Sequence, residues 1–500
     1  MKIGLINPNI TTSVYTPWIP LGILYIGTIL KDNGFRVEIL DAAAKRFTNE
    51  DTMNWIKEIK PDIIGISCLT ISFLPTIELV KLIKNYNPLI TVVLGHYHPT
   101  MVSERIIQKY GQYIDYCIRG EGEYVFLKLC EFLDNRDDKY PLDLKGLTFR
   151  GRNNKIIKTP DAPLIYDLDE IPFPDRKLID FDYKWSFSGI EFSNSNLTSV
   201  VSSRGCPFSC TYCACSNFAK HRFRPRSSEN IVEELLYLEE QGYEQITFVD
   251  DNFTLQPKRT IKVCELIKKE KIDISWHTDS RVDRLSQNML TWMKKSGCKS
   301  LWFGFESANQ RILDLYQKNT KVSQFDTAIK KSRKANIELI IGLFMLGGPT
   351  ETLEEVKNTI NYAIRSDIDL PFFNVVEIWP GIQMWDEYIS QGLINPSDVV
   401  LAQVNDIKKP VERWETTTRV LDLSDSSREK YEILNEIQSA YERFFSLNRL
   451  NTLLKTSLRV LRSKFMLKMA LSIFGNLKDA IDAISTFRSS KVKGFGMYEE

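Results

Sequence analysis

Three cysteines occur close together in the stretch Ser203-Arg204-Gly205-Cys206-Pro207-Phe208-Ser209-Cys210-Thr211-Tyr212-Cys213. Their spacing is C-x3-C-x2-C, and an aromatic residue stands directly before the third cysteine. Cysteine thiolates hold iron–sulfur clusters, and three thiolates in one loop leave one iron of a 4Fe-4S cluster without a protein ligand. That open iron is a catalytic position, because another molecule must bind there.

A structural zinc site is the main alternative for these cysteines. Structural zinc takes four ligands, usually from two paired clusters, and no second C-x2-C or H-x3-H pair lies within the usual spacing. Cys215 could supply a fourth thiolate, but it follows Cys213 too closely for both to face one metal easily. Nine cysteines scattered over the chain do not form a disulfide framework either. The pattern therefore favours an iron–sulfur cluster.

The cysteine motif resembles that of the radical S-adenosylmethionine (SAM) superfamily. The resemblance implies that Cys206, Cys210 and Cys213 hold the cluster and that SAM binds the open iron through its amino and carboxylate groups. It also implies that the reduced cluster cleaves SAM to a 5'-deoxyadenosyl radical, with Tyr212 beside the adenine.

Composition indicates an ordinary soluble globular protein of about three domains, since the 500 residues are 43% apolar and 26% charged. The net charge of +1 gives no general attraction for nucleic acid. No apolar run is long enough to span a membrane. Residues 1–6 read directly as a strand, so we expect no targeting segment and a cytoplasmic location.

Short apolar runs alternate with helical patterns in the first part of the chain. Strands are expected at 3–6, 37–40, 63–67, 91–94 and 116–118, with a helix over 21–33. Strands separated by helices predict a Rossmann-like parallel sheet of five strands, whose ligands bind at the carboxyl ends of the strands. The candidate ligand-binding residues at those ends are Asn7, Asp41, Ser67, Thr70, Gly95, His98 and Glu121.

This first domain resembles the cobalamin-binding domain that is fused to many radical SAM enzymes. The matching pieces are the run from Pro20 to Tyr25, the loop ending His98-Pro99-Thr100, and Arg119-Gly120-Glu121-Gly122-Glu123. The D-x-H-x-x-G motif is missing, so we expect bound cobalamin to carry neither its own base nor that histidine on cobalt. His98 is a candidate to approach the corrin, while His96 stands where the family usually has a glycine; an ordinary polar loop is the alternative for both.

A second series of strands follows a proline-rich connector that includes an expected hairpin over 145–150 and 155–158. The strands are expected at 198–202, 245–249, 274–277, 300–305, 339–345 and 373–378, with a helix over 228–241 capped by Ser228. Six such units predict an open (β/α)6 barrel, similar to the partial barrel of the radical SAM superfamily, with its site at the carboxyl ends of the strands.

Polar residues and glycines at those ends are candidates to bind SAM. Arg281 can pair with the carboxylate, and Glu306 and Ser307 can accept hydrogen bonds from ribose or amine. Glycines allow close approach of backbone to the nucleoside. The remaining candidates are Asp250, Asp251, Gly347 and Gly348. For each of these side chains the alternative role is a hydrogen-bonded cap at a strand end.

The C-terminal part contains a basic, amphipathic, helix-like segment over 434–474. It can cap the barrel, or it can lie on a membrane surface, in which case the substrate would be lipid-like. The expected organisation is a cobalamin-binding-like domain over 1–140, a linker over 141–195, a partial barrel over 196–390 and a helical region over 391–500.

Four functions remain compatible with these motifs. The leading prediction, from the resemblance, is a cobalamin-dependent radical SAM methyltransferase that acts on an unactivated carbon of a small-molecule or lipid-like substrate. The family resemblance also implies an external electron donor such as flavodoxin or ferredoxin. The alternatives are a radical cyclase or rearranging enzyme, a methylthiotransferase with a second cluster on Cys68, Cys117 and Cys130, and a non-catalytic cobalamin sensor.

Overall fold

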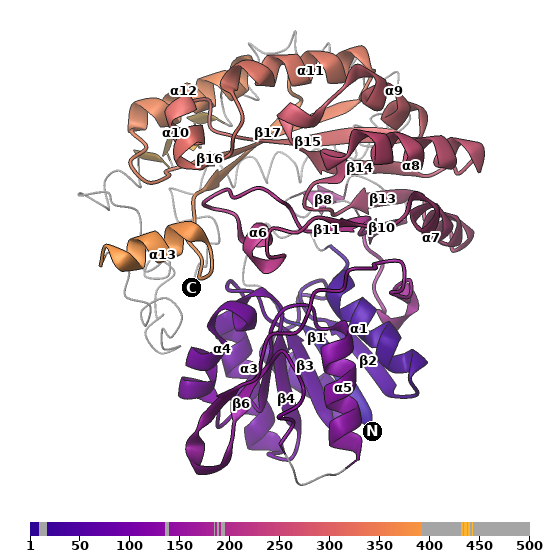
Figure 1. Ribbon diagram of the computed structural model, residues 1–500, viewed down its shortest axis with the longest axis vertical. Coiled ribbons are helices and arrows are strands. Elements are labelled where there is room, and N and C mark those ends of the chain that lie inside the picture. The colour runs from indigo at the N-terminus through magenta and orange to yellow at the C-terminus, as the bar shows by residue number, and fades with distance from the viewer. Residues whose placement is uncertain are drawn as a thin grey trace.

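Two α/β domains stack on each other, with the carboxyl ends of their strands facing a shared layer of loops (Figure 1). The computed structural model describes residues 1–9, 18–135, 140–184, 186–187, 190–191 and 196–392, with 432–433, 435–437, 439–440 and 443. Most of the basic segment expected over 434–474 lies outside the described residues. Ile433, Ile437 and Ala440, near its start, are buried against the core of the second domain.

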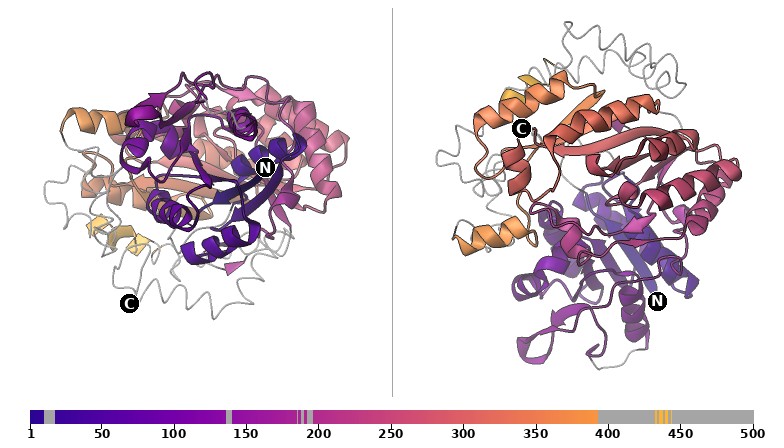
Figure 2. Two further views of the ribbon diagram at one scale, coloured as in Figure 1. Left: turned by 90° about the horizontal axis from the view of Figure 1, so that it is seen from below. Right: turned by 45° about the horizontal axis from the view of Figure 1, so that its top comes forward.

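The first domain is a doubly wound sheet in the order β2-β1-β3-β4-β5-β6-β7. Its five parallel strands are β1 (Lys2–Asn7), β2 (Arg36–Asp41), β3 (Ile63–Ser67), β4 (Thr91–Gly95) and β5 (Tyr116–Ile118). They alternate with α1 (Leu21–Asp32), α2 (Asn49–Ile59), α3 (Phe73–Tyr86), α4 (Tyr97–Tyr110) and α5 (Glu123–Asp134). Helices cover both faces of this sheet (Figure 2).

Successive residues of a strand pack into two separate hydrophobic cores, one on each face of the sheet, because side chains alternate between the faces. Ile64 and Ile66 of β3 pack with α2, α3 and α4, whereas Ile63 packs with α1 and α5. Residues buried on both faces explain why the strands read as continuous apolar runs.

The hairpin that the sequence placed in the linker belongs to the first sheet. Strands β6 (Leu147–Arg150) and β7 (Ile156–Lys158) add to β5 in antiparallel register, with Tyr116 opposite Phe149. Leu147 and Phe149 are almost fully buried. The three-residue strand β5 would otherwise be an open edge, and the hairpin satisfies its backbone groups.

The second domain is an open sheet of six parallel strands in the order β10-β13-β14-β15-β16-β17. The strands are β10 (Leu197–Val200), β13 (Gln245–Phe248), β14 (Ser275–Ser280), β15 (Cys298–Glu306), β16 (Leu339–Leu346) and β17 (Leu370–Val375). The helices between and after them are α7 (Ser228–Glu240), α8 (Pro257–Lys269), α9 (Gln287–Lys295), α10 (Gln310–Leu315), α11 (Phe325–Lys334), α12 (Leu353–Arg365) and α13 (Gln383–Ser390). In Figure 1, α8, α9, α11 and α12 form the outer layer.

Two local predictions for this domain are corrected by the structure. The cap of α7 is Ser227, whose side chain accepts from the backbone of Asn230, and Ser228 is the first helical residue. The last strand begins at Leu370 and not at residue 373, because Leu370 and Pro371 pair with β16 at the edge of the sheet, where proline is tolerated. Among the described residues, no helix is long and apolar enough to cross a membrane.

Candidate active site between the two domains

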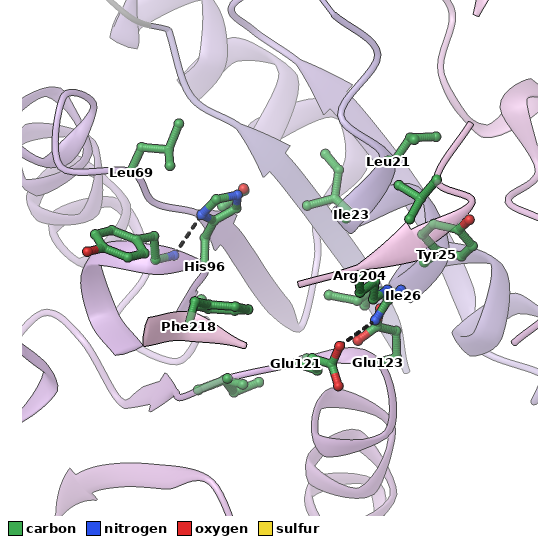
Figure 3. Close-up of a pocket in the computed structure, with 18 of the residues that line it drawn as sticks. Leu21, Ile23, Tyr25, Ile26, Leu69, His96, Glu121, Glu123, Arg204 and Phe218 are labelled. Atoms are coloured by element: carbon green, nitrogen blue, oxygen red, sulfur yellow. Dashed lines mark hydrogen bonds and ion pairs between the residues drawn. The ribbon is translucent and has the colours of Figure 1, made fainter. Parts of the chain in front are cut away.

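A cavity of about 650 Å³ lies between the carboxyl ends of the first sheet and the cysteine loop of the second domain. Its inner wall is apolar and comes from the first sheet, including Leu5, Gly65, Val93 and Ile118. Figure 3 shows side chains from both domains converging on this space. Of the residues predicted to bind the cluster or SAM, Asp251 lines this cavity. The three motif cysteines, Tyr212, Arg281 and Glu306 do not belong to its lining.

The cysteine loop is held on a short antiparallel ribbon of β11 (Ser203–Arg204) and β12 (Arg224–Pro225) and runs into α6 (Ala214–Phe218). Gly205 has φ +84, and a Cβ there would lie 2.1 Å from the carbonyl oxygen of Arg222. Only glycine fits this turn. The Gly205 N–H donates to Asp251 at 2.7 Å, which ties the loop to the end of β13.

The three motif cysteines lie close enough to influence one another electrostatically. Burial raises the pKa of Cys206, and the charges of Cys213, Asp251 and Cys210 raise it further. A hydrogen bond from the Cys215 thiol lowers the pKa of Cys213 to about 6. Within the described ranges, no group of three or more Cys, His, Asp or Glu side chains is already positioned to hold a metal ion. The donor chemistry nevertheless fits a 4Fe-4S cluster, because one loop carries three thiols, and the neighbouring Gly205, Ala214 and Cys215 line the cavity.

Tyr212 belongs to a buried polar group at the centre of the second domain. Its hydroxyl donates to the Glu306 carboxylate at 3.2 Å, and the Lys318 ammonium donates to the same carboxylate at 2.7 Å. Glu306 adopts a left-handed conformation with φ +62. A residue keeps such an unfavourable backbone conformation only where the contacts around it enforce that conformation. Conformations of this kind are concentrated at functional sites.

Lys318 is a member of this group that no sequence motif marks. The residue sits in a loop after α10 and matches no motif, so the only signal was an isolated lysine a short distance beyond Glu306. Its side chain is almost fully buried and pairs with Glu306. Lys318 also donates to the Tyr212 hydroxyl at 3.3 Å, so it is the third member of this buried group.

The other residues predicted near the cysteine loop differ in their surroundings. The guanidinium of Arg281 lies 3.8 Å from the centre of the Phe208 ring and pairs with Asp283 at 3.0 Å. Asp250 is buried and accepts from the backbone and hydroxyl of Ser202, at 2.7 and 2.6 Å. Arg281 therefore flanks the loop itself, whereas Asp250 supports the strand behind it.

The remaining SAM candidates form the framework around β16. Glu351 accepts from the backbone N–H groups of Gly347 and Gly348, at 2.8 and 3.0 Å. A Cβ on Gly348 would lie 2.1 Å from the Tyr316 hydroxyl, so this position must be glycine. Ser307 is fully buried and lies 3.2 Å from the hydroxyl of Thr359, away from open space.

The predicted residues of the first domain separate into two groups. Ser67, Thr70, Gly95 and Glu121 line the cavity. Asn7, Asp41 and His98 do not belong to its lining. Asp41 is 1% exposed and accepts from Asn7 at 2.8 Å and from the Tyr183 hydroxyl at 2.6 Å.

His98 lies beneath the cavity, and His96 lines the cavity wall in its stead. His98 is 1% exposed, its Nδ1 lies 3.0 Å from the Thr70 hydroxyl, and its ring packs on Phe73 at 4.4 Å. The His96 side chain faces the cavity (Figure 3).

Glu121 joins the two domains at the mouth of the cavity. Its carboxylate accepts from Arg224, with two contacts of 2.9 Å, and from Arg204 at 3.0 Å. Arg204 also donates to Glu123 at 2.6 Å. Both arginines belong to the ribbon that carries the cysteine loop, so this cluster fixes the loop against the first domain.

The inside of the partial barrel is aromatic. The Trp302 ring stacks on Phe372 at 5.6 Å and on His277 at 6.0 Å, and Trp18 of the first domain lies 5.9 Å from His277. Asp279 lies on the same face of β14 as His277. Desolvation by the surrounding barrel, followed by the charge of Glu306, raises the pKa of Asp279 to about 7.

The cysteines proposed for a second cluster are separated by the first sheet. Cys68 and Cys117 belong to the core on one face, whereas Cys130 belongs to the core on the other face. All three are fully buried. They could meet at one cluster only if the domain refolded, so the structure gives the methylthiotransferase alternative no support.

A three-cysteine loop at the mouth of an open parallel barrel, facing a doubly wound domain across one cavity, defines the class of radical SAM enzymes with a cobalamin-binding domain. Residues 200–363 match the family model of the radical SAM superfamily, and residues 9–129 match that of the B12 binding domain. A Pyrococcus horikoshii protein named as an uncharacterized methyltransferase is 36% identical over 79% of this chain and 84% of its own. The chain belongs to this cobalamin-dependent radical SAM family.

Two further comparisons agree with this assignment. The anaerobic magnesium-protoporphyrin IX monomethyl ester cyclase of Rubrivivax gelatinosus is 26% identical over 89% of this chain and 77% of its own. The fold is that of the radical SAM methyltransferase TsrM from Kitasatospora setae, solved with cobalamin and a [4Fe-4S] cluster, with a TM-score of 0.66, 17% identity and coverage of 89% of this chain and 88% of that one. The cofactors of the chain are accordingly a 4Fe-4S cluster, SAM and cobalamin.

Proposed function

We propose that the protein is a methyltransferase that adds a methyl group to a carbon atom of a small molecule held between its two domains. The observation that carries this proposal is the shared cavity, which is lined by the ligand-binding edge of the first sheet and by Gly205, Ala214 and Cys215 of the cysteine loop. When bound, the cluster with SAM supplies a carbon-centred radical and cobalamin supplies the methyl group. A single cavity reached from both sides suits a reaction that needs both cofactors at one substrate.

The residues of the chain position SAM in this proposal. Cys206, Cys210 and Cys213 hold the cluster. Lys318, which is buried and positively charged, binds the SAM carboxylate together with Arg281. Glu306 accepts from the ribose hydroxyls, and the Tyr212 ring lies against the adenine.

The inside of the barrel supports a substrate with a flat apolar part. Trp302, Phe372 and His277 offer stacked rings, and ring pairs of this kind favour planar partners. Asp279 adds one carboxyl group whose pKa is raised by desolvation and by the charge of Glu306. A lipid-like substrate fits the same apolar surface if it carries a ring system.

Radical cyclisation is the second candidate, and the cyclase of Rubrivivax gelatinosus supports it by matching most of this chain. The two reactions use the same cofactors and differ in the product. A gain of one CH2 in product mass indicates methyl transfer, whereas a loss of hydrogen indicates ring formation. Both reactions need electrons from outside the chain, and a flavodoxin or ferredoxin is the proposed donor.

Isotope transfer under anaerobic conditions tests methyl transfer before the substrate is known. The holoenzyme with reduced cobalamin is mixed with SAM labelled in its methyl group, and the cobalamin is then analysed by mass spectrometry. We expect labelled methylcobalamin, and 5'-deoxyadenosine once the cluster is reduced. The Cys213→Ala variant is the control and should fail to make 5'-deoxyadenosine.

Two outcomes would contradict the proposal. Formation of 5'-deoxyadenosine without any labelled methylcobalamin would favour the cyclase. Cobalamin binding without either product would favour a sensor.

A further inference from the structure

His96 occupies a position in the cavity wall that its own backbone disfavours. It is the residue before α4, with φ +85 and ψ −162. This conformation is open almost only to glycine and costs other residues roughly 1–3 kcal/mol. A histidine kept here at such a cost points to a use for its side chain.

Neighbouring residues hold His96 in this conformation. Its carbonyl oxygen accepts from the Thr100 hydroxyl at 2.6 Å. The same hydroxyl accepts from the Gly120 N–H at 3.0 Å, which links the β4 loop to the β5 loop. The ring is thereby fixed on the cavity side, near Leu69 and Phe218 (Figure 3).

The hydrogen bond of the ring defines its tautomer. The backbone N–H of Tyr97 donates to Nδ1 of His96 at 2.6 Å. A neutral imidazole that accepts at Nδ1 carries its proton on Nε2. The His96 side chain is exposed, and it faces the cavity.

This tautomer leaves His96 with no lone pair for a metal. The lone pair of Nδ1 is directed at the Tyr97 N–H, and Nε2 carries a hydrogen, whereas ligation of cobalt requires an unprotonated nitrogen. The ring can instead donate one hydrogen bond from Nε2 into the cavity.

We propose that His96 holds cobalamin by donating its Nε2 proton to an oxygen acceptor of the cofactor, and that it does not coordinate cobalt. The inference rests on the assignment of cobalamin to this cavity. The acceptor class is a carbonyl or phosphate oxygen, since cobalamin offers both in its ring amides and in its nucleotide tail.

The His96→Gly variant tests the proposal, because glycine relieves the strain at φ +85 while removing the donor. We expect a thermal midpoint equal to or above that of the wild type, with hydroxocobalamin bound about tenfold more weakly, as for the loss of one hydrogen bond. His96→Asn retains a side-chain N–H donor at this position, and its hydroxocobalamin affinity should lie between those of the wild type and His96→Gly.

Asn153→Gly is the matched control. Asn153 has φ +59 in the exposed turn of the β6–β7 hairpin, away from the cavity lining. Its replacement also puts glycine at a position of positive φ, and it should leave hydroxocobalamin binding unchanged.

Cobinamide, which lacks the nucleotide tail, separates the two acceptors and reports the cobalt ligand. If His96→Gly binds both cobalamin and cobinamide about tenfold more weakly than the wild type, the acceptor is a ring amide. If only its affinity for cobalamin falls, the acceptor is the phosphate. In the paramagnetic spectrum of bound cob(II)inamide we expect no splitting from a histidine nitrogen.

Two results would overturn the inference while leaving cobalamin binding intact. The first is a nitrogen splitting in the wild type that disappears in His96→Gly. The second is equal affinity of the wild type and His96→Gly for hydroxocobalamin. If the wild type binds no cobalamin at all, the proposed function fails together with the inference.

Discussion

Lys318 and Glu306 form a buried ion pair whose members depend on each other. The distance from Lys318 Nζ to Glu306 Oε1 is 2.7 Å, and both side chains are buried. Removal of one partner leaves an uncompensated buried charge, which typically costs about 3–5 kcal/mol, whereas removal of both can be neutral.

We therefore expect Lys318→Ala to lower the free energy of unfolding by about 3–5 kcal/mol. The double variant Lys318→Met/Glu306→Gln should recover most of that stability, yet both variants should lose SAM binding. Urea unfolding and equilibrium dialysis with SAM measure the two effects. If the double variant bound SAM with the affinity of the wild type, Lys318 and Glu306 would not be part of the SAM site.

A second residue-scale prediction concerns pH. Burial raises the pKa of Glu351 to about 7, although the N–H groups of Gly348 and Gly347 partly oppose the shift. The folded state keeps a proton that the unfolded chain releases near its ordinary value of 4.5. Stability from this group is therefore complete below pH 4.5 and is lost as the pH rises through about 7.

Glu351→Gln does not titrate, so its thermal midpoint relative to the wild type should increase from pH 5 to pH 8. Glu354→Gln, at an exposed position of the following helix, is the control and should show no such trend. A constant difference between Glu351→Gln and the wild type would contradict the raised pKa.

The site residues that could be predicted from the sequence are those that belong to a motif with a fixed spacing or follow a predicted strand. The three cysteines, Tyr212 and Glu306 follow from local sequence and remain predictions for their chemical roles. Lys318 and His96 were not predicted as site residues, because the first gains its role from a contact 12 residues back along the chain and the second from an unusual backbone angle. Spacing in the sequence carries neither kind of information.

At the scale of elements, the β11–β12 ribbon is held to the first domain by charges that are hidden from water. Glu121 and Arg224 are each 5% exposed. Burial alone would raise the pKa of Glu121, but the hydrogen bond from Arg224 and the charge of Arg204 lower it. The ionised carboxylate thus stabilises the ribbon at neutral pH, and that stabilisation is lost as the pH falls below about 4.5.

Glu121→Gln should lower the free energy of unfolding by about 3 kcal/mol, because both arginines lose a charged partner in a buried setting. The comparison is Glu104→Gln, which breaks the exposed pair with Lys158 and should cost no more than about 1 kcal/mol. Urea denaturation at pH 7 measures both. Equal effects would show that the buried cluster does not hold the domains together.

The elements themselves were largely predictable, because buried parallel strands and amphipathic helices leave strong periodic signals. The hairpin of β6 and β7 was located correctly but assigned to a linker. Its partner is β5, about thirty residues earlier in the sequence, and strand pairing over such a distance leaves no local signal.

At the scale of the whole molecule, the cavity makes cobalamin a bridge between the two domains. A ligand that binds only the folded state stabilises it by about 2.7 kcal/mol at one hundred times its dissociation constant. Because residues of both domains line the cavity, we expect hydroxocobalamin to raise the melting temperature of both domains together. Scanning calorimetry checks this, and a shift confined to the first domain would contradict a shared site.

The overall pairing of a doubly wound domain with an open six-stranded barrel was confirmed by the structure and by the family comparisons. The way the two domains meet was not predictable, since it depends on contacts such as Glu121 with Arg204 and Trp18 with His277. Each of these residues looks like an ordinary surface group when only its own domain is considered.

The enclosed position of the cysteine loop has a consequence for how the protein matures in the cell. Cys206 is only 9% exposed once the ribbon is fastened by Arg204 and Arg224. An iron-donating chaperone needs access to all three thiols, so we expect metallation to precede the docking of the two halves. Nascent chains that close too early would accumulate as stable but inactive apoprotein.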